Sequence, residues 1–254
     1  MKIEKLKESE ESIKFLIKDI DFGFANVIRR SVFEIPVLAI DEVEFYKNDS
    51  ALYDEILAHR LGLVPLKASN TFTKPKECSC KGKGCLKCTA ALKLKAKGPA
   101  TVSTSELKAK GIMPVFKDMP LVLLEKDQEL EFSATATLGT AKEHAKFSCG
   151  MIWFNSFPEI TIKGCDGCSK CVEICPKKAI TLKDKTIIID PLKCDLCDAC
   201  KELCKDKKAI KIQPSKTDFI FNIESFGQID AREIFIEAVK VWDENLKELE
   251  SEIK

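Results

Sequence analysis

The sequence lacks a long hydrophobic run and an excess of charge of either sign. Its longest uninterrupted aliphatic stretches, at 37–40 and 121–124, have four residues each, whereas a membrane helix needs roughly 20 apolar residues. The chain of 254 residues has 41 basic and 40 acidic side chains, which excludes a generally basic nucleic-acid coat and a polyacidic tail. The N-terminus, MKIEKLKESEES, has no apolar segment of a secretory signal, so we expect a cytoplasmic protein.

Tyrosine, tryptophan and histidine are also scarce, with two of each. Proteins that bind nucleic acid rely on a basic surface and on aromatic stacking, so the sequence argues against direct contact with nucleic acid. An apolar content of 45% and a charged content of 32% are typical of a globular protein.

Cysteine, in contrast, is abundant, with 13 residues. In a chain without a secretory signal, metal binding is favoured over a disulfide framework. The spacing C-x2-C-x2-C-x3-C occurs at Cys165, Cys168, Cys171 and Cys175. It recurs 29 residues later at Cys194, Cys197, Cys200 and Cys204. An Ala-Ile pair follows each run, at 179–180 and 209–210, which indicates an internal duplication.

The duplicated pattern resembles the bacterial two-cluster ferredoxin module, in which each cubane takes three thiolates from one run and the fourth from the other. The resemblance implies one [4Fe–4S] cluster on Cys165, Cys168, Cys171 and Cys204. It implies a second on Cys194, Cys197, Cys200 and Cys175. Structural zinc is the alternative, but zinc usually takes two C-x2-C pairs separated by a longer loop. Lys205 stands where the first run has Pro176, which predicts a second run that is more exposed or more labile.

A separate cysteine quartet has the spacing C-x-C-x4-C-x2-C, at Cys78, Cys80, Cys85 and Cys88. Gly82 and Gly84 permit a tight turn within it, and four thiolates on a short loop suit a closed zinc site. Four lysines would offset the charge of a zinc tetrathiolate: Lys76, Lys81, Lys83 and Lys87. The alternative is that one or two of these thiols are free at the surface. Cys149 stands alone, and a lone cysteine is most often a small core residue.

Hydrophobic periodicity predicts a mixed chain of strands and helices. We expect strands at 11–20, 37–46, 92–96 and 130–138, a helix over 24–34 that ends before Pro36, and another strand after Pro214 in which Phe219, Phe221 and Ile223 alternate. Residues 48–50 predict an N-cap for a helix at 51–61 that ends at Gly62. Asp230 and Glu233 predict a capping box for a final helix at 231–250.

The final helix has more apolar residues than a single buried stripe requires. One stripe has 3, 4, 3, 4 spacing and consists of Phe235, Ala238, Trp242, Asn245 and Leu249. A second apolar flank consists of Ile234, Ile236, Val239, Val241 and Leu246. The pattern therefore predicts burial against two surfaces, one of them on another chain.

Three stretches closely resemble one protein family. They are residues 25–30 (ANVIRR) continuing into 34–36 (EIP) and 39–41 (AID), residues 58–66 (AHRLGLVPL), and residues 139–146 (GTAKEHAK). In this order they resemble the D-type subunit of archaeal DNA-directed RNA polymerase, which is similar to the N-terminal region of the bacterial polymerase α subunit and to the third subunit of eukaryotic polymerase II. The resemblance covers essentially the whole chain.

The resemblance implies an α+β fold with three domains. Residues 1–46 and 215–254 would form a polymerase alpha-type dimerisation domain, 47–160 an inserted β-rich domain with the cysteine loop 78–88, and 161–214 a 4Fe-4S ferredoxin-like domain. It also implies partners: the small L-type subunit as heterodimer partner, the small N-type subunit and the large catalytic subunits. The implied partner contacts are Arg29, Arg30, Lys142, Glu143, Phe235, Ala238, Trp242 and Leu249.

The paired arginines and the two histidines also have ordinary structural explanations. Paired arginines are commonly a solvated helix face, although an arginine fork suits carboxylates and carbonyls across a subunit contact. His59 is expected to be a structural histidine, since it has no ligand-like companions in the sequence. His144 has no nucleophile partner, and the family resemblance implies a loop that contacts a large subunit.

The preferred function is a non-catalytic assembly subunit of DNA-directed RNA polymerase, a nucleotidyltransferase whose activity belongs to the complex. The alternative is a ferredoxin-like electron-transfer subunit of an oxidoreductase. The cluster module supports it, but that module fills only about a fifth of the chain, and no flavin or nicotinamide motif accompanies it. A third alternative, a zinc-type nucleic-acid module, fits poorly with the neutral charge. We expect the clusters to fold their own domain, since metal binding supplies folding energy where apolar content is low.

Overall fold

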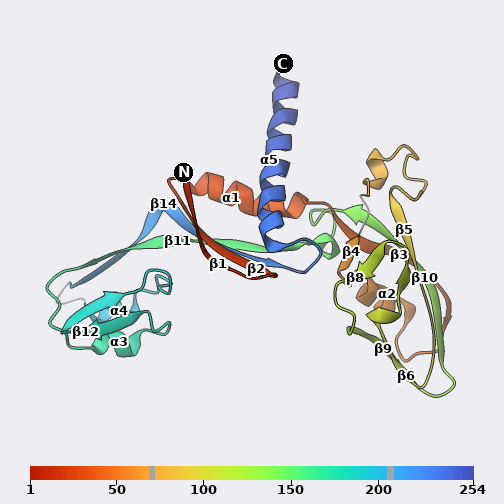
Figure 1. Ribbon diagram of the computed structural model, residues 1–254, viewed down its shortest axis with the longest axis horizontal. Coiled ribbons are helices and arrows are strands. Elements are labelled where there is room, and N and C mark those ends of the chain that lie inside the picture. The colour runs from red at the N-terminus through yellow and green to blue at the C-terminus, as the bar shows by residue number, and fades with distance from the viewer. Residues whose placement is uncertain (69–71, 205–208) are drawn as a thin grey trace. The chain divides into compact units, whose positions relative to one another are not determined.

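The computed structural model describes residues 1–68, 72–204 and 209–254, which form two compact units (Figure 1). Unit 1 comprises Met1–Glu8, Lys14–Asn26 and Trp153–Asn222, and unit 2 comprises Ser9–Ile13, Val27–Ile152 and Ile223–Lys254. Both units contain helices and strands, which confirms the α+β class. Residues 161–214 lie in unit 1 and residues 47–152 in unit 2, while the boundaries of the three domains stay a prediction. No helix within the described ranges is both long and apolar enough to cross a membrane.

The main sheet of unit 1 has four strands in the order β1-β2-β14-β11. They are β1 (Lys2–Glu8), β2 (Ser12–Lys18), β14 (Ile210–Ser225) and β11 (Gly150–Ile162). Phenylalanines fill its core: Phe15 stacks on Phe221 at 5.5 Å between ring centroids, and Phe154 meets Phe219 edge-on at 5.4 Å. Such aromatic pairs add stability beyond their buried area.

Two details of this sheet correct the prediction. Hydrophobic periodicity implies that the strand predicted at 11–20 alternates between a buried and an exposed face, but Phe15, Leu16 and Ile17 of β2 are all buried. β14 begins at Ile210, before Pro214 and not after it. The strand β14 starts early because its two ends pack in two different cores. Its first residues, Ile210 and Ile212, pack in the cysteine-rich module, whereas Phe219 and Phe221 pack in the sheet.

Unit 2 is built on a sheet in the order β3-β10-β5-β7. Its strands are β3 (Val37–Asn48), β10 (Glu129–Gly139), β5 (Thr89–Lys97) and β7 (Lys108–Ala109), so the strands predicted at 37–46, 92–96 and 130–138 are confirmed. Phe132 pairs with Phe45 on one neighbour and with Leu94 on the other. Two small two-stranded sheets complete the β-rich part: β4 (Leu66–Ala68) with β8 (Ile112–Pro114), and β6 (Ala100–Ser103) with β9 (Pro120–Leu124).

The core of unit 2 is large and aliphatic. The helix α2 (Asp54–Gly62) buries Leu57 and Leu61 in the same cluster as Leu92, Leu130 and Phe132. Short 3-10 helices η1 (Val32–Glu34), η2 (Pro75–Glu77), η3 (Thr104–Glu106) and η4 (Ala145–Phe147) connect the elements. The predicted first helix is α1 (Phe22–Ser31), which continues as η1 up to the turn before Pro36.

Both predicted helix caps are wrong. The helix α2 starts at Asp54, and no side chain caps it. The Asn48 amide instead donates to the carbonyl oxygen of Leu52 at 2.9 Å and to Asp54 Oδ1 at 2.7 Å, because short polar side chains often bind nearby backbone in a turn rather than a helix end. The final helix, α5 (Ala231–Ile253), also lacks a side-chain cap at Asp230. The Asp230 carboxylate lies 4.0 Å from Lys67 Nζ instead.

Candidate metal centres and assembly surface

The duplication of the cysteine-rich module extends to its backbone. Each run leads into a five-residue helix, α3 (Lys170–Ile174) or α4 (Ala199–Leu203), and the two helices contact each other. Gly167 and Leu196 are 29 residues apart, as are Ser169 and Asp198, and all four have a positive φ between 60° and 72°. The loops before the two helices therefore bend in the same unusual way. The hairpin of β12 (Ile180–Lys183) and β13 (Thr186–Ile189) packs beside them.

The cysteines of this module gather in two sets. Burial raises the pKa of the Cys171 thiol, and the negative charges of Cys204 and Cys165 raise it further. Cys204 thus lies with the first run, although it belongs to the second in sequence. Cys171 is buried, while Cys168 is exposed.

The second set is arranged in the same way. Burial raises the pKa of Cys200 to about 11, and the charges of Cys194, Cys197 and Cys175 add to the effect. One small cavity is lined by all four of these cysteines, together with Ile180, Ile189 and other residues of the module. Cys175 therefore lies with the second run. Lys205, which replaces the proline of the first motif, falls outside the described residues.

The donor chemistry of both sets fits iron–sulfur clusters. Thiolate sulfur is the ligand that holds cubanes, and each set presents four thiols from two segments of chain. The apolar core around them is small: its buried members are Cys171, Ile180, Ile187, Ile189, Cys200, Ile210 and Ile212. Two of the seven are themselves cysteines, so bound metal would supply a large share of the folding energy of the module.

The separate quartet of Cys78, Cys80, Cys85 and Cys88 is already arranged around one point. Its sulfur atoms all lie within 4.8 Å of one another. Three of the sulfur–sulfur distances are 3.6 Å (Cys78 to Cys85), 3.5 Å (Cys80 to Cys88) and 3.7 Å (Cys85 to Cys88). A tetrahedral ion with bonds of about 2.3 Å to sulfur has edges of about 3.8 Å. The geometry therefore fits a closed four-coordinate zinc ion.

The local backbone explains why the quartet closes. Gly82 and Gly84 have φ angles of 78° and 82°, a region that glycine enters without steric cost, as the predicted tight turn requires. The Cys88 N–H donates to the Cys85 carbonyl oxygen at 2.9 Å. The hydrogen bond from Cys88 lowers the pKa of Cys80 to about 7. Among the described residues, this is the one group of three or more ligating side chains close enough to share an ion.

The remaining cysteine and histidine predictions concern single residues. Cys149 is buried in unit 2, and burial raises its pKa to about 11, so the predicted core role is confirmed. His59 is exposed on α2. His144 Nδ1 accepts a hydrogen bond from the Lys146 backbone N–H at 3.1 Å, which fixes the ring locally.

The helix α5 divides into a packed part and an open part. Ala231, Ile234 and Ala238 are buried, and Phe235 and Trp242 are half-buried. Every residue from 243 to 253 is exposed, and Figure 1 shows no other element of the same unit beside this end of the helix. The exposed apolar side chains are Ile236, Val239, Leu246, Leu249 and Ile253. The division does not follow the two predicted stripes, because the buried pair Ile234 and Ala238 and the exposed pair Leu246 and Leu249 each take one member from either stripe. The predicted partner contact Ala238 is buried within the chain, whereas Leu249 is exposed.

Two of the predicted partner contacts already have internal partners. Lys142 Nζ lies 2.6 Å from Glu34 Oε1. Glu143 Oε2 accepts from the Thr140 N–H at 3.0 Å, and its Oε1 lies 3.3 Å from Lys76 Nζ. Both side chains remain about half exposed or more, at 59% for Lys142 and 50% for Glu143.

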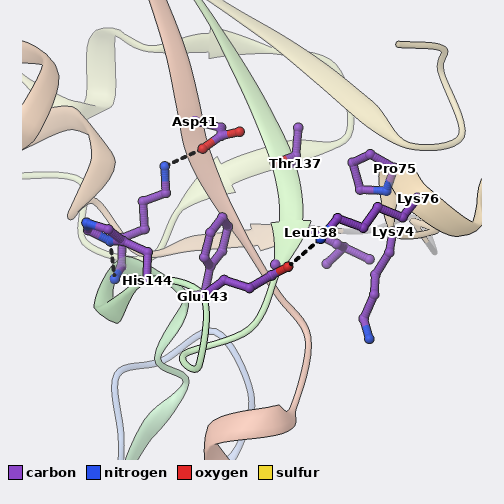
Figure 2. A pocket seen from close by; sticks show the side chains of 11 residues that line it. Asp41, Lys74, Pro75, Lys76, Thr137, Leu138, Glu143 and His144 are labelled. Atoms are coloured by element: carbon purple, nitrogen blue, oxygen red, sulfur yellow. Dashed lines mark hydrogen bonds and ion pairs between the residues drawn. The ribbon is translucent and has the colours of Figure 1, made fainter. Parts of the chain in front are cut away.

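A cavity of about 420 Å³ lies beside this loop. Figure 2 shows the Glu143 carboxylate pointing toward Lys76 and an ion pair at Asp41, which Lys146 forms. The polar lining is mixed in charge: Asp41 pairs with Lys146, and Glu143 pairs with Lys76.

The first arginine of the predicted pair, Arg29, is half-buried at the end of α1, and Arg30 is exposed. Sequence reasoning missed a neighbour, Glu34, which accepts from Asn245 Nδ2 at 3.1 Å. Two signals pointed to these residues. Glu34 stands inside a stretch that carries the family resemblance, and Asn245 is the polar member of an otherwise apolar stripe.

Comparison with known proteins covers both units. Residues 42–156 match the RNA polymerase Rpb3/RpoA insert domain, and residues 164–209 match the 4Fe-4S dicluster domain. The chain is 39% identical to DNA-directed RNA polymerase subunit Rpo3 of Methanothermobacter thermautotrophicus, over 93% of each chain. It is 36% identical to Rpo3 of Methanosarcina acetivorans, over 95% of this chain and 94% of the relative. It is 34% identical to Rpo3 of Pyrococcus horikoshii, over 95% and 93%.

Proposed function

Since the chain belongs to the Rpo3 family of DNA-directed RNA polymerase subunits, we propose that it is the non-catalytic assembly subunit of such a polymerase. It forms a heterodimer with a small sister subunit of the L type through α5. The resulting platform recruits the small N-type subunit and then the large catalytic subunits, which carry the nucleotidyl transfer. The complex works in the cytoplasm, without direct sequence-specific contact between this chain and nucleic acid.

The open apolar face of α5 is the observation that carries the proposal. Leu246, Leu249 and Ile253 are 46%, 53% and 77% exposed, respectively, on the part of the helix with no buried residue. Exposed apolar side chains in a row along a helix mark a contact with another protein. The other face, with Ile234 and Ala238, anchors the helix in unit 2.

The metal centres act as supports in this proposal. One [4Fe–4S] cluster is held by Cys165, Cys168, Cys171 and Cys204. A second is held by Cys194, Cys197, Cys200 and Cys175, and zinc is held by Cys78, Cys80, Cys85 and Cys88. When bound, the metals supply folding energy that the small cores around them lack. The chain's own residues position these thiols through the paired positive-φ loops and the two glycines of the quartet.

A matched pair of substitutions on α5 tests the proposal. Leu249→Asn removes an apolar side chain from the open face, and burial of a leucine contributes about 1.5–3 kcal/mol. We expect the affinity for the purified L-type subunit to fall about tenfold to a hundredfold, as measured by isothermal titration calorimetry. Lys247→Asn introduces the same residue on the polar face, where it removes only the exposed ion pair with Asp243.

Three outcomes have different meanings. A loss of affinity in Leu249→Asn alone supports docking on the apolar face. Equal affinity in both variants and the parent protein excludes that face. Co-purification of the native chain with a flavoprotein, and not with two large subunits, would favour the electron-transfer alternative.

A further inference from the structure

The Glu34 carboxylate lies where three segments far apart in the sequence meet. These are η1, the loop of residues 140–144 (the 140–144 loop) and α5. Its Oε1 is 2.6 Å from Lys142 Nζ, and its Oε2 accepts from Asn245 Nδ2 at 3.1 Å. Each carboxylate oxygen therefore binds a different segment, and loss of either oxygen would free one of them.

The surrounding contacts strengthen both connections. The backbone N–H of Lys142 donates to the Phe33 carbonyl oxygen at 3.2 Å, so the 140–144 loop is attached to η1 by its main chain as well. The 3-10 helix η1 packs directly against α5. A shift of α5 relative to η1 would therefore change the distance between Asn245 and Glu34.

Glu34 lines a groove of about 510 Å³ together with residues of the 140–144 loop and of α5. Leu138 and Thr140 line it from the side of the loop, and Val241 and Glu244 line it from α5. The carboxylate forms a polar bridge between Lys142 and Asn245, and both of these partners also line the groove.

The bridge is charged near neutral pH. Burial would raise the pKa of the Glu34 carboxyl, but hydrogen bonds from Lys142 and Asn245, with the charges of Lys142 and Arg30, outweigh burial and hold the pKa below its usual value. Only a quarter of the side chain, 25%, is exposed. Charge-assisted hydrogen bonds of this kind are about twice as strong as neutral ones.

Asn245 gives the bridge its significance for assembly. It lies on α5 in the stripe between Trp242 and Leu249, at the start of the part of the helix that has no buried residue. We infer that Glu34 is a positioning residue that couples the orientation of α5 to the conformation of the 140–144 loop. Docking of the sister subunit on α5 thereby orders the loop for the next protein partner. This inference rests on the proposed function, since it takes α5 as the docking helix.

The variant Glu34→Gln tests the coupling in the full-length, metal-loaded chain. Glutamine keeps the shape but is uncharged, and its amide nitrogen replaces one of the two acceptor oxygens, so the charge-assisted bond from Lys142 is weakened and the two bonds that the carboxylate accepts cannot both remain as they are. Hydrogen exchange of residues 139–146 is measured with and without the purified L-type subunit. In the parent chain we expect binding to slow exchange about tenfold, within the usual range of a coupling free energy. In Glu34→Gln this slowing should be lost, while the dissociation constant stays within about threefold of the parent value.

Lys76→Gln is the matched control. It breaks the exposed pair between Lys76 and Glu143 of the same loop without touching Glu34, and should keep the full response to the sister subunit. If Glu34→Gln does not fold, Lys142→Met removes the loop side of the bridge and must abolish the response in its place. Slowing that is equal in the parent and in the bridge variant overturns the coupling. Failure of the parent chain to bind the L-type subunit overturns the proposed function instead.

Discussion

Equivalent cysteines of the duplicated module occupy equivalent environments. Cys171 and Cys200, 29 residues apart, are both buried, whereas Cys168 and Cys197, also 29 apart, are both exposed. The repeat therefore preserves the surroundings of each thiol as well as the spacing. Because burial raises the pKa of Cys171 and Cys200, these thiols must release a proton when metal binds, and metal affinity should rise with pH.

Crossed ligand sets make a prediction about single substitutions. Cys175→Ser should remove the same cluster as Cys200→Ser, although these residues belong to different runs, and Cys204→Ser should remove the other. Each variant is expected to lose about half of its iron and sulfide, since each set would hold one of the two proposed cubanes. Electron paramagnetic resonance of the reduced proteins identifies which cluster remains. Matching spectra for Cys175→Ser and Cys171→Ser would contradict the crossed arrangement, and Cys149→Ala serves as a control with full metal content.

Glu34 predicts a specific dependence of stability on pH. Its folded-state pKa is lowered from 4.5, so its contribution is fully present above the unfolded value and is lost as pH falls through the folded value. Glu34→Gln should therefore be less stable than the parent at pH 7, and this difference should shrink below about pH 4.5. Urea denaturation of the two proteins across that range measures the difference, in which the effects of metal loss cancel. If the difference in stability between the two proteins stays constant with pH, the ionised Glu34 carboxylate is not its cause.

At the scale of elements, the cysteine loop has almost no apolar core of its own. The loop between η2 and β5 places Cys78 and Cys88 inside, whereas Leu86 is 95% exposed. Neither buried cysteine belongs to the large aliphatic cluster of unit 2. The loop is thus attached to the sheet but does not share its core.

Zinc removal should therefore unfold the loop and spare the sheet. Treatment with a chelator is expected to speed hydrogen exchange in residues 73–88 by at least about tenfold, since a closed metal site supplies the local folding energy. Exchange in β3, β5 and β10 should not change, because their cluster contains none of the four thiols. Cys88→Ser should reproduce the effect without a chelator. Collapse of the whole sheet after chelation would show that the ion supports the main core as well.

At the scale of the whole molecule, each unit contains a core cluster among its described residues. The cysteine-rich core of unit 1 contains Ile180, Ile187 and Ile189, and the core of unit 2 contains Leu92, Leu130 and Phe132. The helix α5 belongs to unit 2. Loss of the clusters should therefore affect the two units unequally.

The double variant Cys165→Ser, Cys194→Ser tests this separation. It should unfold much of residues 161–204, because the cysteine-rich module loses the folding energy that bound metal supplies. The recruitment of the large subunits should weaken as a result. Binding of the L-type subunit should stay within about threefold of the parent, since α5 packs in the other unit. Purified subunits mixed stepwise and followed by size-exclusion chromatography measure each stage. Normal assembly at every stage would show that the clusters have no part in it.

Sequence by itself determined the features that depend on short-range spacing. The cysteine runs, the quartet with its two glycines and the strand at 130–138 were all predictable, because chelation by neighbouring thiols and the alternation of a strand are local properties of the chain. The same reasoning failed at Asp230 and at residues 48–50, where the side chains found other partners in the folded protein.

Only the tertiary structure decided which side chains meet across long separations. Glu34, Lys142 and Asn245 are more than 100 residues apart from one another, and no periodicity connects them. The fold also decided which face of α5 is filled by its own unit and which stays open. The physical reason is that a local pattern shows that a side chain needs a partner, whereas packing of distant elements determines which partner comes within reach.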